Sequence, residues 1–275
     1  MCMLVVVFIQ EVLDRMKPLI DVIFRSEKRK NTLLLLKDNP GKMDFLLKEL
    51  DSTRQALLPQ IRILEDHFLV TGYNDVYELT TIGKLIADEV QPLLGTMDVL
   101  NEDIEYWGTH KLDFIPEHLR LNIRDLQGFR TIKPSLTEMF ELNREYYDYA
   151  KKSGSLYKLT TYFHPDFPAF FEELTDNNVR INFIITEDLL DKLRSERYGD
   201  YAKSMGNELI NLFVYPKKTD LLTYTFNDHC ILMRLLKDNG ESDVNHIICN
   251  NPSAVEWGRK MFEHFLQDSI PVTGM

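Results

Sequence analysis

The sequence predicts a chain of two domains, an α+β domain at the N-terminus and a larger α/β domain with a mixed sheet at the C-terminus. Three observations support this fold class. Apolar residues follow a helical spacing up to residue 68 and are followed by a hairpin pattern. Strand patterns alternate with helical ones after residue 135. The length of 275 residues suits one large or two ordinary domains.

Residues 19–68 predict three helices, separated by an Asp-Asn-Pro-Gly stop at 38–41 and an Asp-Ser-Thr turn and cap at 51–53. In the short middle helix, Phe45, Leu46 and Leu50 should face inward. Pro59 is expected in the first turn of a helix that begins near residue 57 or 58, since proline inside a helix would cost about 3 kcal/mol. The other apolar positions expected on core faces are Leu19, Ile20, Ile23, Phe24, Leu33, Leu34, Leu36, Leu57, Ile61, Leu64 and Phe68.

Two short alternating runs around a Gly-Tyr-Asn-Asp turn, at residues 69–80, predict a β-hairpin. Residues 81–104 return to helical spacing, with Pro92 and Gly95 as points where the helix could bend or divide. Helices followed by a hairpin are the order of a winged helix-turn-helix, which we place at residues 19–105. The last helix is apolar on more than one face, so we expect it to form a homodimer contact.

The charge of the chain is unevenly distributed. The net charge is −11, yet residues 25–62 hold nine basic and five acidic residues, a net of +4 that leaves −15 for the remainder. A basic stretch within an acidic protein is typical of a nucleic-acid-binding module attached to another domain. An ordinary solvated helix face is the alternative.

The third helix is the candidate recognition helix, because arginine and glutamine read guanine and adenine edges in the major groove. We expect Arg54, Gln55 and Gln60 to approach base edges, with Thr53 close to a thymine methyl group. Asp75 at the hairpin tip would repel phosphate, so the wing should contribute little, through Tyr73 and Asn74. The residues expected to approach phosphate are Lys28, Arg29, Lys30, Lys42 and Arg62.

Residues 106–134 are predicted to form linker helices, and residues 135–270 the α/β domain. Asn251 and Pro252 are expected to cap and open a final helix. The other helices are predicted at 135–152, 165–175 and 187–197. The strands are predicted at 155–162, 179–186, 212–215, 222–226, 230–236 and 244–249.

No spacing in this domain matches a catalytic, cofactor or metal motif, and the three cysteines form no CxxC pair. We therefore expect no enzyme activity, no cofactor and no metal. Ligands of open α/β sheets bind at the carboxyl ends of strands, which points to the ends near Tyr162 and Thr186. The residues predicted to line a ligand pocket there are Tyr162, His164, Thr186 and Asp228, with Phe163 and Phe167 as its apolar wall. Packed core without a cavity is the alternative.

The first 18 residues form an apolar segment too short for a membrane span and without the basic start of a signal peptide. A buried element or a misassigned start site would explain it. We therefore expect a cytoplasmic protein without membrane contact.

Several motifs resemble those of winged-helix regulators from methanogenic archaea. They are LIDVIFRSEKR at 19–29, LPQI at 58–61, YELTTIGK at 77–84, IPEHL at 115–119, and AVEWG at 254–258 followed by Met261 and Phe262. The resemblance is to regulators with the Fil-type methanogenesis-regulatory C-terminal domain. It implies a dimeric transcription regulator whose C-terminal domain senses a signal and has a phospholipase-D-like fold. That chemistry needs a His-x-Lys pattern, which is missing here, so the resemblance implies a non-catalytic domain.

We thus expect a sequence-specific regulator that binds double-stranded DNA and senses a small molecule or a protein signal. A hydrolase of the α/β half is one alternative. The other is a DNA-binding partner of a signalling kinase without a small ligand.

Overall fold

The computed structural model describes residues 19–194 and 199–272, so the apolar segment 1–18 lies outside the described residues. The chain separates into two compact units, Met1–Leu94 and Gly95–Met275, which are treated one at a time. In the described part of the chain, no helix combines the length and the apolar run that a membrane crossing requires.

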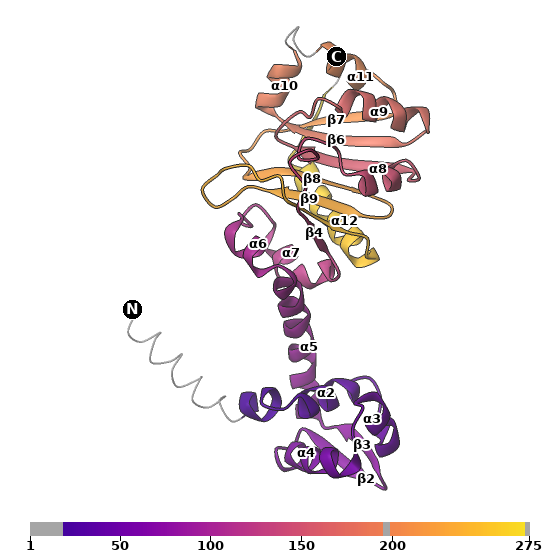
Figure 1. The fold of residues 1–275 in the computed structure, drawn as a ribbon, viewed down its shortest axis with the longest axis vertical. Coiled ribbons are helices and arrows are strands. Elements are labelled where there is room, and N and C mark those ends of the chain that lie inside the picture. The colour runs from indigo at the N-terminus through magenta and orange to yellow at the C-terminus, as the bar shows by residue number, and fades with distance from the viewer. Residues whose placement is uncertain (1–18, 195–198, 273–275) are drawn as a thin grey trace, which may run out of the picture. The chain divides into compact units, whose positions relative to one another are not determined.

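The N-terminal unit has the predicted order of helices followed by a hairpin (Figure 1). Residues 19–24 are helical. A small antiparallel sheet has the strand order β1-β3-β2. The elements are α2 (Glu27–Leu35), β1 (Gly41–Lys42), α3 (Met43–Glu49), α4 (Arg54–Asp66), β2 (Val70–Tyr73), β3 (Val76–Leu79) and α5 (Thr81–Glu102).

The core of this unit is formed by apolar residues at helical spacing, and Leu57, Ile61 and Leu64 of α4 are fully buried. The inward prediction is wrong for Phe45, whose side chain is 45% exposed. Because α3 begins at Met43, the buried positions are Met43 and Leu46, and Phe45 lies off that face. Phe68 is 71% exposed because α4 ends at Asp66 and Phe68 adopts a positive φ.

The predicted start of α4 is also wrong. The helix begins at Arg54, after Thr53 in extended backbone, and the Thr53 carbonyl accepts the N–H groups of Ala56 and Leu57. Pro59 therefore lies in the second turn, where its missing N–H leaves the carbonyl of Gln55 without a helical partner. Gln55 is exposed, so water can satisfy that carbonyl and the proline is tolerated.

The C-terminal unit contains a mixed sheet of eight strands in its described residues, in the order β11-β7-β6-β5-β8-β9-β10-β4. The three strands β7, β6 and β5 are parallel, and the remaining pairs are antiparallel. The strands are β4 (Arg130–Ile132), β5 (Ser155–Thr160), β6 (Arg180–Thr186), β7 (Ile210–Tyr215), β8 (Leu221–Asn227), β9 (Ile231–Leu235), β10 (His246–Cys249) and β11 (Ile270–Pro271).

Helices cover both faces of this sheet (Figure 1). One face packs with α12 around Trp257, and the other with α9 around Phe171. Alternate residues of one strand enter the two cores, as Leu159 and Leu156 of β5 do. The helical elements are α6 (Ile104–Thr109), α7 (Glu117–Arg120), η1 (Ile123–Leu126), α8 (Arg144–Ala150), α9 (Phe167–Asp176), α10 (Glu187–Leu193), α11 (Gly199–Met205) and α12 (Pro252–Gln267).

Two predicted segments differ from the structure. Residues 106–134 are more than a linker, because Trp107 and Leu126 enter the α12-side core and β4 extends the sheet beside β10. The helix predicted at 135–152 is shorter, since α8 begins after Asn143, whose side chain caps it by accepting the N–H of Tyr146. The predicted cap of α12 by Asn251 is confirmed. The short elements β1, β4, β11 and α11 were not predicted.

Gly83 of α5 provides a stability test, because a Cβ there would lie 1.9 Å from the carbonyl oxygen of Leu69. We expect Gly83→Ala to destabilise the N-terminal unit by about 2 kcal/mol or more, since rigid backbone cannot yield to the added methyl group. Urea denaturation measures the change. The control is Gly108→Ala in α6, where no atom lies within 4 Å and the higher helix propensity of alanine should be neutral or slightly stabilising. Equal midpoints for Gly83→Ala and wild type would contradict the packing.

Candidate nucleic-acid interface and ligand pocket

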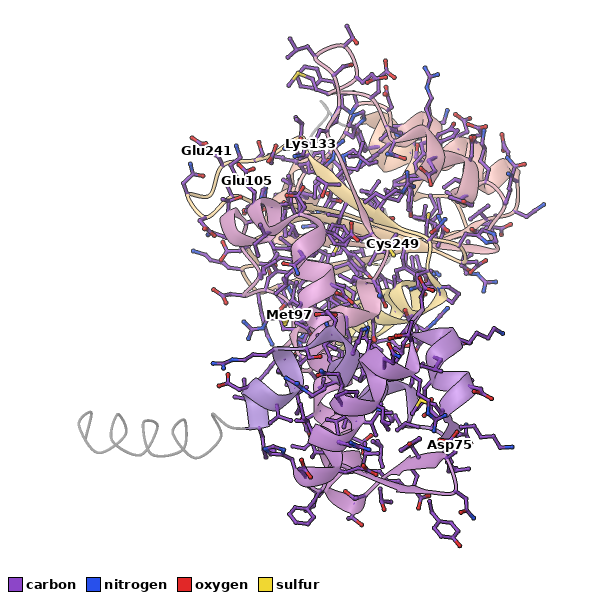
Figure 2. All side chains as sticks on the ribbon, turned by 60° about the horizontal axis from the view of Figure 1, so that its bottom comes forward. Asp75, Met97, Glu105, Lys133, Glu241 and Cys249 are labelled. Carbon is purple, nitrogen blue, oxygen red and sulfur yellow. The ribbon has the colours of Figure 1, made fainter. Side chains whose placement is uncertain are left out.

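The tip of the hairpin and the first turn of α4 are joined by an ion pair. Arg54 donates from Nη1 and Nη2 to the two carboxylate oxygens of Asp75, at 3.1 and 2.5 Å. The hydrogen bond and the charge of Asp75 raise the pKa of Arg54. The Asp75 carbonyl also accepts the N–H of Met43, at the start of α3. We call Arg54, Gln55, Tyr73, Asn74 and Asp75 the α4–wing surface (Figure 2 labels Asp75).

The hairpin turn itself follows from its sequence. Asn74 and Asp75 both have positive φ, at 50° and 63°, as the tight turns that match strand twist require. Asparagine and aspartate tolerate this conformation better than other side chains. Asp75, one of the two turn residues with a positive φ, therefore also supplies the carboxylate that holds Arg54.

Two of the predicted DNA-contacting residues form contacts inside the unit. The Oε1 atom of Gln60 accepts hydrogen bonds from Arg29 Nη1 at 2.7 Å and from Ser26 Oγ at 3.2 Å, which joins α2 to α4. Arg29 also donates to the carbonyl of Val22. A base contact by Gln60 or a phosphate contact by Arg29 would have to compete with these bonds.

The other predicted basic residues differ in their exposure. Arg62 is exposed and follows Gln55 by two helical turns, so the two share a face of α4. Lys30 is half-buried, and its ammonium group lies 2.7 Å from Glu27. Lys28 is also half-buried. The remaining exposed residues of the predicted set are Lys42, Thr53, Arg54, Gln55, Tyr73 and Asn74.

In the C-terminal unit, Tyr162, Phe163 and His164 line an open hollow of about 600 Å³, which we call the outer pocket. Phe167 lines a neighbouring inner cavity of about 40 Å³. The two hollows share Tyr162 and Arg234. Four of the six predicted pocket residues are therefore brought together at the end of β5.

The other two predicted residues lie elsewhere. Thr186 ends β6 and lines a separate hollow with Thr161 and Tyr215. Asp228 belongs to the opposite end of the sheet, where it accepts the N–H of Gly154 at 2.7 Å. Because β8 runs antiparallel to β5, the end of β8 lies beside the start of β5. Grouping Asp228 with Tyr162 was therefore wrong.

His164 is held in a neutral form by its neighbours. Its Nε2 atom lies 2.8 Å from the carbonyl oxygen of Phe140, and its Nδ1 atom accepts the backbone N–H of Asp166 at 3.2 Å. Burial lowers the pKa of His164 and outweighs the hydrogen bond to Phe140 and the charge of Asp166, which act in the opposite direction. His164 thereby fixes residue 140 at the edge of the outer pocket.

Lys158 of β5 lines the inner cavity and was not predicted. In the alternating run Ser155–Thr160 a lysine resembles a solvent-facing residue, but both faces of this sheet are covered and Lys158 is only 5% exposed. Burial lowers its pKa to about 7, and the nearby charge of Arg234 acts in the same direction. Sequence alone offers no sign of this burial.

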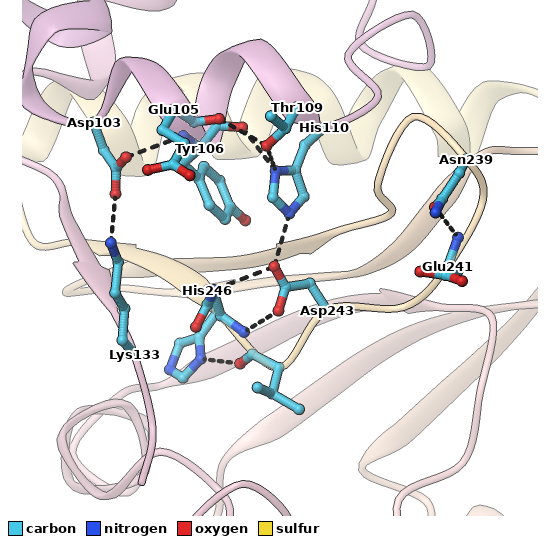
Figure 3. Close-up of polar contacts among 12 residues, drawn as sticks. Asp103, Glu105, Tyr106, Thr109, His110, Lys133, Asn239, Glu241, Asp243 and His246 are labelled. Carbon is cyan, nitrogen blue, oxygen red and sulfur yellow. Dashed lines mark hydrogen bonds and ion pairs between the residues drawn. The ribbon is translucent and has the colours of Figure 1, made fainter.

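A polar network joins α6 to the loop between β9 and β10 (Figure 3). His110 Nδ1 lies 2.7 Å from the carbonyl oxygen of Tyr106, and Nε2 lies 3.1 Å from Asp243 Oδ2. Burial would raise the pKa of Asp243, but hydrogen bonds from the Asn245 backbone and from His110 outweigh it and lower that pKa. The network fixes Asp243, which also lines the outer pocket.

The chain matches family models for both of its units. The N-terminal domain of "Methanogenesis regulatory protein FilR1" matches residues 17–98, and the middle domain of the same protein matches residues 139–268. A curated relative, methanogenesis regulatory protein FilR1 of Methanothrix harundinacea (strain 6Ac), is 25% identical over 258 residues. That alignment covers 91% of this chain and 57% of the relative, so the chain spans little more than half of that protein's length. The chain belongs to the Fil-type family of methanogenesis regulatory proteins.

Two solved structures are distantly similar to the chain. TrmBL2, an archaeal chromatin protein described as binding DNA, has 14% identity and a TM-score of 0.40, with 94% of this chain and 99% of that chain covered. Phosphatidylserine synthase of Haemophilus influenzae Rd KW20 has 12% identity and a TM-score of 0.32, with 46% and 36% covered. At these scores neither likeness bears on the fold or the function of this chain.

The lowered pKa of buried His246 leads us to expect a loss of stability in acid. Burial lowers its pKa to about 4, and its ring accepts a hydrogen bond from Asn143 Nδ2 at 3.0 Å. Between about pH 6.5 and pH 4 the unfolded chain binds a proton that folded His246 does not, so stability is lost as the pH falls through this window. The loss should approach about 3 kcal/mol at pH 4.

The measurement is urea denaturation of wild type and His246→Gln at pH 7 and pH 4.5. We expect the variant to lose less stability between the two pH values than wild type. The control is His118→Gln, which replaces an exposed histidine of α7. Equal acid losses in wild type and His246→Gln would refute the assignment.

Proposed function

We propose that the chain is a transcription regulator that binds double-stranded DNA through the N-terminal unit and senses a small molecule through the C-terminal unit. The observation that carries the proposal is the start of α4, where Arg54 and Gln55 are exposed and Arg54 forms an ion pair with Asp75 of the hairpin. The order of elements is that of a winged helix, and residues 25–62 are basic in an acidic chain. Membership of a regulatory family supports the same reading.

In this proposal α4 enters the major groove and its first turn reads bases. Asp75 accepts one N–H from each Nη of Arg54 and fixes the plane of the guanidinium. The edge that carries Nε–H and the second N–H of the adjacent Nη remains available to guanine. Gln55 reads a neighbouring base. Gln60 and Arg29 keep α2 against α4, so phosphate contacts rest on Lys28, Lys30, Lys42 and Arg62.

The C-terminal unit is proposed as a non-catalytic sensing domain with a phospholipase-D-like sheet. Its ligand site is the outer pocket together with the inner cavity, lined by Tyr162, Phe163, His164 and Phe167. His164 uses both ring nitrogens in hydrogen bonds to backbone groups, which suits a structural role better than that of a nucleophile or base. A ligand would alter DNA affinity only by binding two conformations of the chain unequally.

The DNA contacts are tested by titrating the protein with duplexes recovered from genomic footprinting, at several salt concentrations. Arg54→Ala should relax base preference at one position and cost about 1–3 kcal/mol on the preferred duplex. Arg62→Ala should weaken binding to all sequences and reduce the salt slope by about one. Arg120→Ala in the C-terminal unit is the control and should change neither quantity. Wild-type binding by Arg54→Ala would remove the base-reading role.

A homodimer is proposed through α5. Ile82, Leu85, Leu93 and Met97 lie within one side of this helix and are 50%, 64%, 49% and 45% exposed (Figure 2 labels Met97). Exposed apolar stripes of this kind mark interaction surfaces. A two-fold dimer would place two recognition helices about 34 Å apart, one turn of DNA.

Leu85→Glu should therefore shift the protein from dimer to monomer in sedimentation at micromolar concentration, because a carboxylate would be buried at the contact. The matched control is Lys84→Glu, which places the same charge on the opposite side of α5 and should leave the dimer intact. A wild-type protein that sediments as a monomer, with and without DNA, would refute the dimer.

A further inference from the structure

The sheet face covered by α8 and α9 carries a polar row where apolar residues would be expected. Thr160 pairs with Thr223, and Thr223 pairs with Arg234 on the next strand. Lys158 lies beside this row, and its register partner is Thr225. Because the sheet is covered on this face, the row lies inside the unit, where polar groups need partners.

The hydroxyl groups of this row already donate to protein acceptors. Thr223 Oγ1 donates to the carbonyl of Leu159 at 3.2 Å, and Thr225 Oγ1 donates to the carbonyl of Tyr157 at 2.9 Å. The hydroxyl of Tyr146 lies 2.6 Å from Thr225 Oγ1. The row is therefore an ordered framework rather than a set of loose polar groups.

Lys158 is poorly compensated within this framework. Its ammonium group lies 3.3 Å from Thr223 Oγ1 and 4.4 Å from the centre of the Phe167 ring. An ammonium has three donors, and a hydroxyl with an aromatic face does not supply a counter-charge. A buried ammonium group without a counter-charge is costly to keep in a fold.

Arg234 brings a second positive charge to the same inner cavity. Among the described residues, no carboxylate forms an ion pair with Lys158 or Arg234. The two carboxylates that line the outer pocket face histidines instead: Asp243 lies 3.1 Å from His110, and Asp166 lies 3.8 Å from His164. The cavity is thus lined by two neighbouring basic side chains without a carboxylate partner, in a chain whose net charge is −11.

The sizes and walls of the two hollows suit a ligand that carries a negative charge at one end. The inner cavity, at about 40 Å³, has room for a small charged group or a few waters. The outer pocket, at about 600 Å³, shares Tyr162 and Arg234 with the inner cavity and has a largely apolar wall that includes Met139, Phe140 and Leu222. A molecule with a compact acidic head and a less polar body would match both.

We propose that Lys158 and Arg234 form the oxyanion-binding end of the ligand site, and that the ligand is an amphiphilic small molecule whose carboxylate or phosphate enters the inner cavity. The rest of the molecule occupies the outer pocket against Phe163 and Phe140. This deepens the proposed sensing role by naming the class of ligand. It predicts anion binding whether or not DNA is present.

The experiment uses the full chain at constant ionic strength, with potassium chloride as the balancing salt. Hexanoate, inorganic phosphate and the neutral isostere hexanamide are added at millimolar concentration, and binding is followed by the melting temperature and by calorimetry. We expect at least one of the two oxyanions to raise the melting temperature and hexanamide to leave it unchanged. No response to either oxyanion, or a response to hexanamide as large as the response to the oxyanions, would overturn the proposal.

Two variants tie the response to the cavity. Lys158→Met keeps the side-chain volume and removes an uncompensated charge, so it should fold, and it should weaken oxyanion binding about tenfold or more. Arg234→Gln should do the same. Lys152→Met, at an exposed lysine before β5, is the control and should bind as wild type. Undiminished binding by both cavity variants refutes the site.

Measuring DNA binding and oxyanion binding on the same protein separates this inference from the proposed function. If the chain binds its DNA but shows no oxyanion response, the ligand class is wrong and the DNA-binding role stands. If it binds the oxyanion and no DNA, the anion site stands and the regulatory role is wrong.

Discussion

The covering of both faces of the sheet by helices is the constraint on which the C-terminal unit depends. It buries most residues of the central strands, whichever face they occupy. Leu159 and Leu156 meet this condition by entering opposite cores. Lys158 lies on the same strand and is also buried, but it is basic and lines a cavity. The inner cavity therefore combines polar side chains of the sheet with apolar residues of the covering helices.

The order of strands decides where that cavity can open. The parallel strands β7, β6 and β5 end at the same edge, and β8 returns antiparallel beside β5. The chain leaving β5 at Tyr162 therefore separates from its antiparallel neighbour, and His164 fixes the turn through the carbonyl of Phe140. The outer pocket forms at this divergence, which is the kind of position where ligands of open sheets bind.

In the N-terminal unit, the equivalent organising contact is between Arg54 and Asp75. It joins the first turn of α4 to the hairpin tip, and the Asp75 carbonyl extends the connection to α3. An aspartate at a wing tip is unfavourable for phosphate in isolation, which is why the sequence suggested a weak wing. In the fold the same carboxylate orients Arg54, and the proposed effect of Asp75 on DNA binding is exerted through that arginine.

Local patterns in the sequence determined the order of elements and most of the core. Apolar spacing located α4 and α12, the Asn-Asp turn located the hairpin, and Asn251 located a helix start, because each depends on neighbours within a few residues. Tertiary structure alone decided which polar residues meet. Asp228 and Tyr162 are separated by strand direction. Lys158 and Arg234 lie 76 positions apart in the sequence and are brought together at one cavity. Strand direction and register are set by packing across the whole sheet, so no local pattern can reveal them.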